Sequence, residues 1–66
     1  MGKTKLRKAR EDHGYTQRDI AEKAGIAILS YQRYENGKRR PDIDTAFAIC
    51  DIFGTSVEEM FKNGGI

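Results

Sequence analysis

Residues 16–41 constrain the fold of this chain most, because their sequence, TQRDIAEKAGIAILSYQRYENGKRRP, is typical of two short helices joined by a tight turn. Thr16 is a good N-cap for the first helix, and Asp19 can complete a capping box with it. The apolar residues of that helix form one stripe, at Ile20, Ala21 and Ala24. Gly25 can adopt the positive φ that ends a helix, so a second helix can begin within a few residues.

The rest of the chain shows similar helix start and stop signals. We expect helices over about residues 4–13, 17–24, 28–36 and 43–53, and a fifth helix after a capping box of Ser56 and Glu59. No stretch shows the alternation of a strand. The predicted fold class is therefore all-α, a compact five-helix domain with the two-helix unit at its second and third helices.

Composition excludes several classes of protein. Sixty-six residues predict a single domain, 1–66, with little room for an internal active site. The chain has no nucleophile–base pair and no paired carboxylates, so we expect no enzymatic activity. His13 and Cys50 are single and far apart, so we expect no metal, cofactor or intramolecular disulfide. Without a signal peptide or membrane span, we expect a cytoplasmic protein. We also expect no separate effector domain and no small-molecule ligand.

Charge is divided along the chain. Residues 1–40 hold 11 Lys or Arg against 5 Asp or Glu, a net +6, whereas residues 41–66 hold 1 against 5, a net −4. The basic part suits a polyanion such as DNA, and the acidic part should point away from it.

The order and spacing of several short motifs resemble one known family, that of the lambda-repressor-like, phage Cro and repressor (Xre-like) helix-turn-helix proteins. The matching motifs are LRKAR at 6–10, GYTQ at 14–17, IAEKAGI at 20–26, YENG at 34–37, RP at 40–41 and FGTSVEEMF at 53–61. The resemblance implies a helix-turn-helix that binds double-stranded DNA. It further implies a sequence-specific transcriptional regulator, most simply a repressor that binds a palindromic operator as a homodimer.

The resemblance places base contacts on the second helix of this unit. Arg33 is our candidate for guanine, because its planar fork matches the O6 and N7 acceptors, and Gln32 can pair with adenine or reach a phosphate. Ile28 and Leu29 depart from the family, whose residues there are mostly polar, and can contact only a thymine methyl group. Exposed aliphatics also suit a protein-binding patch, so an antitoxin-like or adaptor module of the same fold is the alternative.

Phosphate contacts are expected around that helix. Gln17 begins the preceding helix, where its side chain and backbone N–H can meet a phosphate. The other candidates are polar or basic residues on or after the second helix: Ser30, Asn36, Lys38, Arg39 and Arg40. A solvated surface position is the alternative for each. By resemblance, Arg10 and Glu35 form a structural ion pair.

The last two predicted helices carry more apolar surface than one stripe requires. We predict a homodimer interface from Phe47, Ile49 or Phe53 of the fourth helix together with Val57, Met60 and Phe61 of the fifth. Ordinary core packing of these residues is the alternative.

Overall fold

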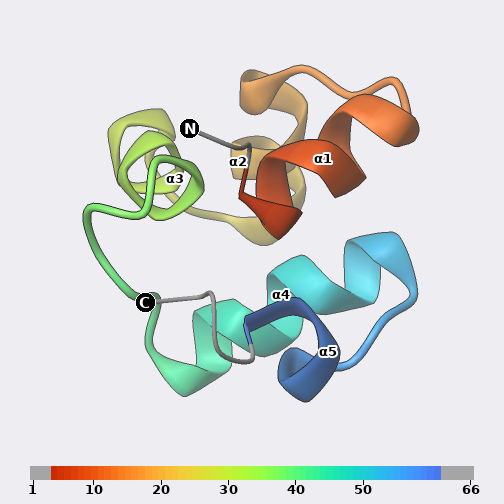
Figure 1. The fold of residues 1–66 in the computed structure, drawn as a ribbon. Coiled ribbons are helices and arrows are strands. Elements are labelled where there is room, and N and C mark those ends of the chain that lie inside the picture. Colours follow the sequence, from red (N-terminus) through yellow and green to blue (C-terminus); the bar gives the residue numbers. More distant parts are fainter. Residues whose placement is uncertain (1–3, 62–66) are drawn as a thin grey trace.

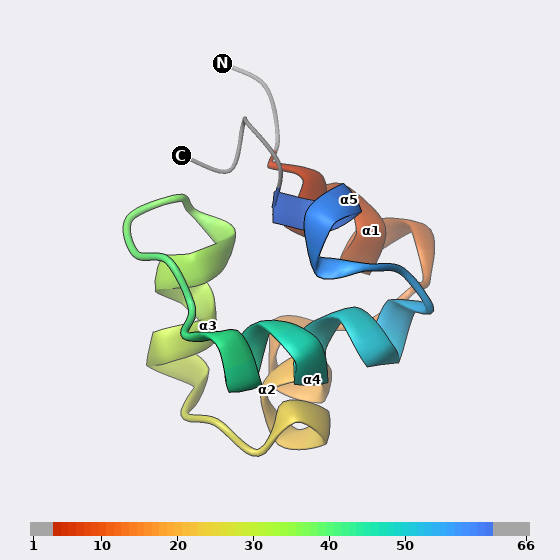
Figure 2. The same cartoon turned by 90° about the horizontal axis from the view of Figure 1, so that it is seen from below.

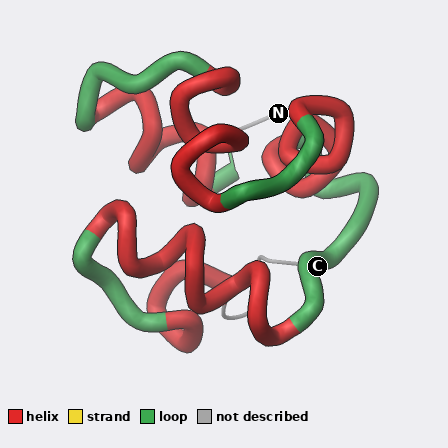
Figure 3. Tube along the Cα trace, turned by 180° about the vertical axis from the view of Figure 1, so that it is seen from behind, coloured by secondary structure: helices red, strands yellow, loops and turns green. Residues whose placement is uncertain are grey.

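The computed structural model describes residues 4–61, which fold into five α-helices joined by short loops (Figure 1). The helices are α1 (Lys5–Asp12), α2 (Gln17–Ala24), α3 (Ile28–Glu35), α4 (Ile43–Phe53) and α5 (Val57–Phe61). Within residues 4–61 no segment is a strand (Figure 3). The predicted all-α, five-helix fold class is therefore confirmed, with helix ends within one residue of the expected positions.

Local hydrogen bonds explain where most of these helices begin and end. The side chain of the residue before the helix accepts a backbone N–H at four starts: Thr4 for α1, Thr16 for α2, Asp42 for α4 and Ser56 for α5. Gly25 and Gly54 end α2 and α4 with φ angles of 72° and 68°, a left-handed conformation that costs glycine little.

The helices lie in two groups that enclose a small core. In Figure 1, α1, α2 and α3 form the upper group, and α4 and α5 lie beneath them. Figure 2 shows α4 crossing α2, with which it packs, and α5 lying against α1. The helix-turn-helix, α2 and α3, is thus supported from below by α4 and leaves one side of α3 open.

The core consists of side chains from all five helices. Its buried members are Leu6, Ile20, Ala21, Tyr31, Ile49, Cys50 and Met60. Each fully buried aliphatic side chain contributes roughly 1.5–3 kcal/mol to the free energy of unfolding. Burial also raises the pKa of the Cys50 thiol, so Cys50 behaves as a small apolar core residue.

Candidate nucleic-acid interface

The start of α2 is fixed by a complete capping box. The Asp19 N–H donates to Thr16 Oγ1 at 3.0 Å, and the Thr16 N–H donates to Asp19 Oδ2 at 2.9 Å. Hydrogen bonding with the Thr16 backbone, and to a smaller extent with the Thr16 side chain, holds the pKa of Asp19 below its ordinary value. Gln17 therefore stands, as predicted, at the first position of a well-defined helix.

The start of α3 has no comparable cap. Ala27 occupies the N-cap position and forms no side-chain hydrogen bond. The next two residues differ in burial: Leu29 is 54% exposed, whereas Ile28 is partly buried and packs against the core. Of the two predicted thymine contacts, Leu29 is thus the more exposed one.

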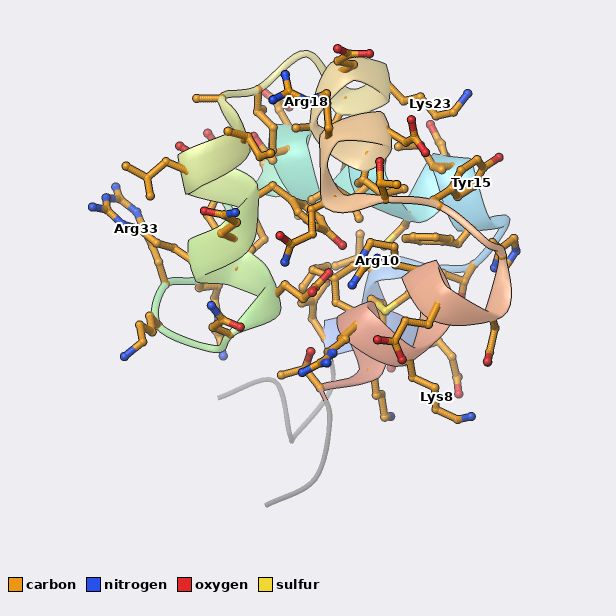
Figure 4. The ribbon with its side chains drawn as sticks, turned by 90° about the horizontal axis from the view of Figure 1, so that it is seen from above. Lys8, Arg10, Tyr15, Arg18, Lys23 and Arg33 are labelled. Atoms are coloured by element: carbon orange, nitrogen blue, oxygen red, sulfur yellow. The ribbon has the colours of Figure 1, made fainter. Side chains whose placement is uncertain are left out.

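Arg33 and Gln32 lie differently on α3. Arg33 is exposed and points away from the other helices (Figure 4). Gln32 is partly buried, and its Nε2 donates to Gln17 Oε1 at 3.1 Å. Ser30 is also partly buried. The structure therefore joins two residues that the sequence analysis treated separately, one from each helix of the unit.

The expected pairing of Arg10 with Glu35 is present and buried. Arg10 Nε donates to Glu35 Oε2 at 2.7 Å and Arg10 Nη2 donates to Glu35 Oε1 at 3.2 Å. The Glu35 side chain is only 1% exposed, and Figure 4 shows Arg10 directed into the space between α1, α2 and α3. Two parallel hydrogen bonds of this kind give both strength and a fixed geometry.

The surroundings of Glu35 keep it ionised. Burial alone would raise the pKa of Glu35, but hydrogen bonds from Arg10 and Gln17 outweigh it and lower the pKa below the ordinary value. The hydrogen bond to Glu35 likewise raises the pKa of Arg10. Tyr31 is fully buried beside this pair. Burial is the main cause that raises the pKa of its hydroxyl, and the nearby Glu35 carboxylate raises it further. That hydroxyl has no hydrogen-bond partner of standard geometry in residues 4–61.

Further contacts of this site were missed by the sequence analysis. Gln17 Nε2 donates to Glu35 Oε1 at 2.9 Å, and Thr4 Oγ1 donates to the Glu35 carbonyl oxygen at 2.7 Å. Arg10 Nη1 donates to the Tyr15 carbonyl oxygen at 2.7 Å. The two bonds to Glu35 join residues 18 and 31 positions apart in the sequence, so no local pattern could have shown them. We call Arg10, Gln17, Gln32 and Glu35 the polar cluster.

The turn after α3 is exposed throughout residues 36–40. Its backbone is organised: the N–H of Asn36 donates to the Gln32 carbonyl and that of Gly37 to the Tyr34 carbonyl. A phosphate contact at Asn36 must therefore come from its side chain. Within residues 4–61, no hydrogen bond or ion pair engages the basic side chains of this turn, Lys38, Arg39 and Arg40.

The predicted dimer face needs correction at two positions. Ile49 has none of its surface exposed and Met60 only 7%, so both lie in the core of the chain and not on a face. Phe53 is partly buried, like Val57 and Phe61, and its ring contacts that of His13 edge to face, with centroids 5.1 Å apart. The apolar repeat of α4 is broad, and its spacing alone did not separate inward from outward positions.

The apolar surface that remains is centred on the start of α4. Phe47 is 54% exposed and Ile43, which the sequence analysis did not select, is 59% exposed. A groove of about 440 Å³ adjoins Ile43 and is also lined by Val57 and Phe61 of α5. We call these four residues the α4–α5 face.

Two other classes of site, metal centres and membrane spans, are absent from the described part of the chain. Within residues 4–61, no three His, Cys, Asp or Glu side chains gather as a metal site would require. Among the same residues, no helix combines the length and the apolar character needed to cross a membrane.

Comparison with known proteins places the chain in a family. A family model described as Helix-turn-helix, HTH_3, matches residues 6–60. An uncharacterized HTH-type transcriptional regulator of Methanocaldococcus jannaschii is 37% identical over 59 residues, which are 89% of this chain and 89% of that protein. The HTH-type transcriptional regulator ImmR of Bacillus subtilis is 36% identical over 60 residues, 91% of this chain and 46% of ImmR. The cryptic phage CTXphi transcriptional repressor RstR of Vibrio cholerae is 31% identical over 58 residues, 88% of this chain and 52% of RstR.

The chain therefore belongs to the helix-turn-helix family of Xre-like and Cro-like regulators, which confirms the resemblance seen in the sequence. Its class is that of DNA-binding HTH-type transcriptional regulators, and not of enzymes. It spans about half the length of ImmR and RstR and most of the archaeal relative. No solved structure gives a significant match.

Proposed function

We propose that this chain binds a specific double-stranded DNA sequence through α3 and acts in the cytoplasm as a transcriptional repressor. One observation carries the proposal: α3 presents Arg33, which is exposed and forms no ion pair within residues 4–61, on a helix whose opposite side is anchored by the buried ion pair of Glu35. A reading side chain is useful only if its helix is held rigidly, because base contacts require accurate placement in the major groove.

Base reading falls mainly to two exposed residues. Arg33 offers a planar fork that matches the O6 and N7 acceptors of guanine, and it has no competing ion pair within residues 4–61. Leu29 lies one helical turn before it and can contact a thymine methyl group. Ile28 contributes less, because the core takes part of its surface.

Phosphate contacts surround these residues. Gln17 uses one Nε2 proton on Glu35, which leaves the second for a phosphate oxygen near the start of α2. On the other side, the exposed basic turn places Lys38, Arg39 and Arg40 next to the end of α3. Ser30 and Asn36 supply the remaining polar groups. Contacts of this type position the protein without reading sequence.

The α4–α5 face supports a homodimer on a palindromic operator. Ile43 and Phe47 are exposed apolar residues, and Ile43 lines a groove; such a surface usually marks an interface. The charge division fits, because the acidic half of the chain would lie between two basic halves and away from phosphate. A two-fold dimer of this fold spans half-sites about 34–36 Å apart.

The test of DNA binding compares two substitutions by fluorescence anisotropy. On a site selected from random DNA, Arg33→Ala should weaken specific binding by about 1–3 kcal/mol and relax preference at one base pair of each half-site. Lys38→Ala should weaken binding on all sequences and reduce the salt slope by about one. Lys8→Ala is the control, because Lys8 points away from α3 and pairs with Asp12 at 3.5 Å (Figure 4). If Arg33→Ala weakens binding equally on specific and random DNA, Arg33 contacts the DNA backbone and not a base.

The second candidate function is a protein-interaction module that keeps the fold. The 54% exposure of Leu29 on the proposed DNA-reading side of α3 favours it. A module of this kind would bind DNA weakly, without base preference, at any salt concentration, so the same titration separates the two functions.

Sedimentation tests the homodimer. The wild-type chain should dimerise in the micromolar range without dependence on reducing agent, because Cys50 is buried. Phe47→Ser should shift the chain toward monomer while leaving its helical content unchanged. Asp51→Asn, at another exposed position of α4, is the control. A wild-type chain that is monomeric at all these concentrations would refute the proposed homodimer.

A further inference from the structure

The first turn of α3 differs from the rest of that helix because it begins with side chains that carry no polar group. Beyond the backbone, Ala27, Ile28 and Leu29 contain only carbon and hydrogen. Ser30 is the first residue of α3 whose side chain can form a hydrogen bond, and it is partly buried. The 54% of Leu29 that is exposed can therefore gain free energy from a ligand only by covering apolar surface.

Leu29 shares its side of α3 with the proposed guanine contact. Residues four apart lie on the same side of a helix, so Leu29 and Arg33 are neighbours there. Arg33 points away from the other helices (Figure 4). The other large apolar side chains exposed within residues 4–61, Ile43 and Phe47, belong to α4. Leu29 is thus an exposed apolar residue on the surface that the proposed function places in the major groove.

The major groove offers such a side chain an apolar group, the methyl group on C5 of thymine. In 5-methylcytosine the same ring carbon carries a methyl group, which lies at the same place in the groove. The two bases differ in the adjacent group, because thymine O4 accepts a hydrogen bond and cytosine N4 donates one. Leu29 can form neither bond, so it has no means of separating thymine from 5-methylcytosine. It separates both from uracil and cytosine, which lack the methyl group.

We infer that Leu29 reads the C5-methyl group and not the identity of the pyrimidine, so that methylation of a cytosine at its position raises the affinity of the chain for DNA. The inference rests on the proposed function, because it assigns a form of regulation to the site that α3 would bind. It goes beyond a thymine contact, since it makes DNA that carries 5-methylcytosine a second ligand. Cytosine methylation is then a signal to which the chain responds.

The size of the effect follows from one methyl group. Covering one such group changes an affinity by about fourfold. Two methyl groups, one in each half-site of a palindromic operator, lie too far apart to influence each other, so their effects should multiply to about 15-fold. Methylation would therefore tune the occupancy of a site and not create binding where there was none.

The first experiment locates the contact. The full chain selects a site from random DNA, and each thymine of that site is replaced in turn by deoxyuridine, which removes the methyl group and keeps O4 and the pairing. Fluorescence anisotropy should show binding weakened about fourfold at one thymine of each half-site. Leu29→Ala should lose this discrimination at the same thymine. Circular dichroism should show the variant folded, because the position is exposed.

The second experiment tests methylation itself. At the thymine so located, the pair is replaced by cytosine·guanine or by 5-methylcytosine·guanine, two duplexes that differ by one methyl group. A side chain that reads the purine of the pair affects both duplexes alike. Wild type should bind the methylated duplex about fourfold more tightly, and Leu29→Ala should bind the two equally.

Two controls separate methyl reading from general changes in affinity. Lys38→Ala, at the exposed turn after α3, removes a proposed phosphate contact, so it should weaken binding to both duplexes and leave their ratio unchanged. A 5-methylcytosine placed outside the selected site should leave the affinity of wild type unchanged.

The outcomes distinguish this inference from the proposed function. A selected site that no deoxyuridine weakens, or a methylated duplex bound no better than the unmethylated one, would overturn methyl reading and leave the proposed function standing. A methyl preference that survives in Leu29→Ala would overturn the assignment to Leu29. If selection yields no preferred site at all, the proposed function fails, and methyl reading fails with it.

Discussion

The two helices of the helix-turn-helix have the same length, eight residues each, but are held in different ways. Helix α2 carries its own signals: a capping box of Thr16 and Asp19 at its start and left-handed Gly25 at its end. Helix α3 begins at Ala27 without a side-chain cap and ends at Asn36, which is not left-handed. Local sequence therefore defines α2, and contacts with other helices must define α3.

Those contacts gather at the end of α3 and on its inner side. Tyr31 and Glu35 are its buried residues, and Glu35 binds Arg10 of α1 and Gln17 of α2. Thr4 Oγ1 donates to the Glu35 carbonyl, one of the last carbonyls of the helix and therefore without a partner inside it. The difference has a functional consequence: α3 is fixed from behind, and its first turn and outer side remain open for DNA.

The largest expected effect comes from removing the anchor of α3. Glu35→Ala leaves Arg10 buried without its partner and also breaks the hydrogen bond from Gln17 Nε2, so the free energy of unfolding should fall by about 3–5 kcal/mol. That is comparable to the whole stability of a small domain. Urea denaturation followed by circular dichroism measures it. Glu58→Ala, at an exposed position of α5, is the control and should change stability by less than about 0.5 kcal/mol. A loss below about 1 kcal/mol in Glu35→Ala would mean that the core alone holds α3.

Acid should weaken α3 for the same reason. The pKa of Glu35 is lower in the folded chain than its unfolded value of about 4.3, so the stability that Glu35 contributes is complete above that pH. It is lost as the pH falls below about 4.3 and through the folded pKa. The Asp19 and Asp42 caps, whose pKa values are also lowered, act in the same direction. Denaturation at several pH values should show a shallower acid slope in Glu35→Gln, and an unchanged slope would assign the acid sensitivity to the caps.

The contrast between the two helices also explains what could be predicted from the sequence. Helix α2 was predicted from Thr16, Asp19 and Gly25 because its signals lie within a few residues. The links from Thr4 and Gln17 to Glu35 span 31 and 18 positions, and only the folded chain brings these residues together. The pairing of Arg10 with Glu35 was expected through family resemblance alone.

The sequence does not predict which apolar residues of α4 are buried. Ile49 and Phe47 are two residues apart on a helix with apolar residues on most sides, and one has no exposed surface while the other is 54% exposed. Periodicity predicts that an apolar stripe exists, but a broad stripe does not show where its centre faces. That position is set by the packing of α4 under α2, which is a property of the assembled fold.

A smaller effect should follow from removing the local cap of α2. Thr16→Ala takes away the hydroxyl that accepts the Asp19 N–H, and the loss of such a cap costs about 1 kcal/mol. Thr16→Ser keeps the hydroxyl and is the control. Because α2 also carries Gln17, the variant should bind DNA more weakly than its stability alone predicts. A stability loss as large as that of Glu35→Ala would contradict the distinction drawn between the two helices.

The smallest expected effect is a gain of stability at α3. Ala27 has an extended backbone, with φ −69° and ψ 144°, the conformation that an N-cap residue requires. Ala27→Ser should therefore supply the missing cap without rearrangement and raise the free energy of unfolding by about 0.5–1 kcal/mol. Ala27→Val, which suits the same backbone but cannot cap, is the matched control. If the first turn of α3 meets a phosphate with its free N–H groups, the serine must compete for them, and affinity for DNA should fall while stability rises. Stability and affinity that rise together would show that the free N–H groups of this turn do not bind a phosphate.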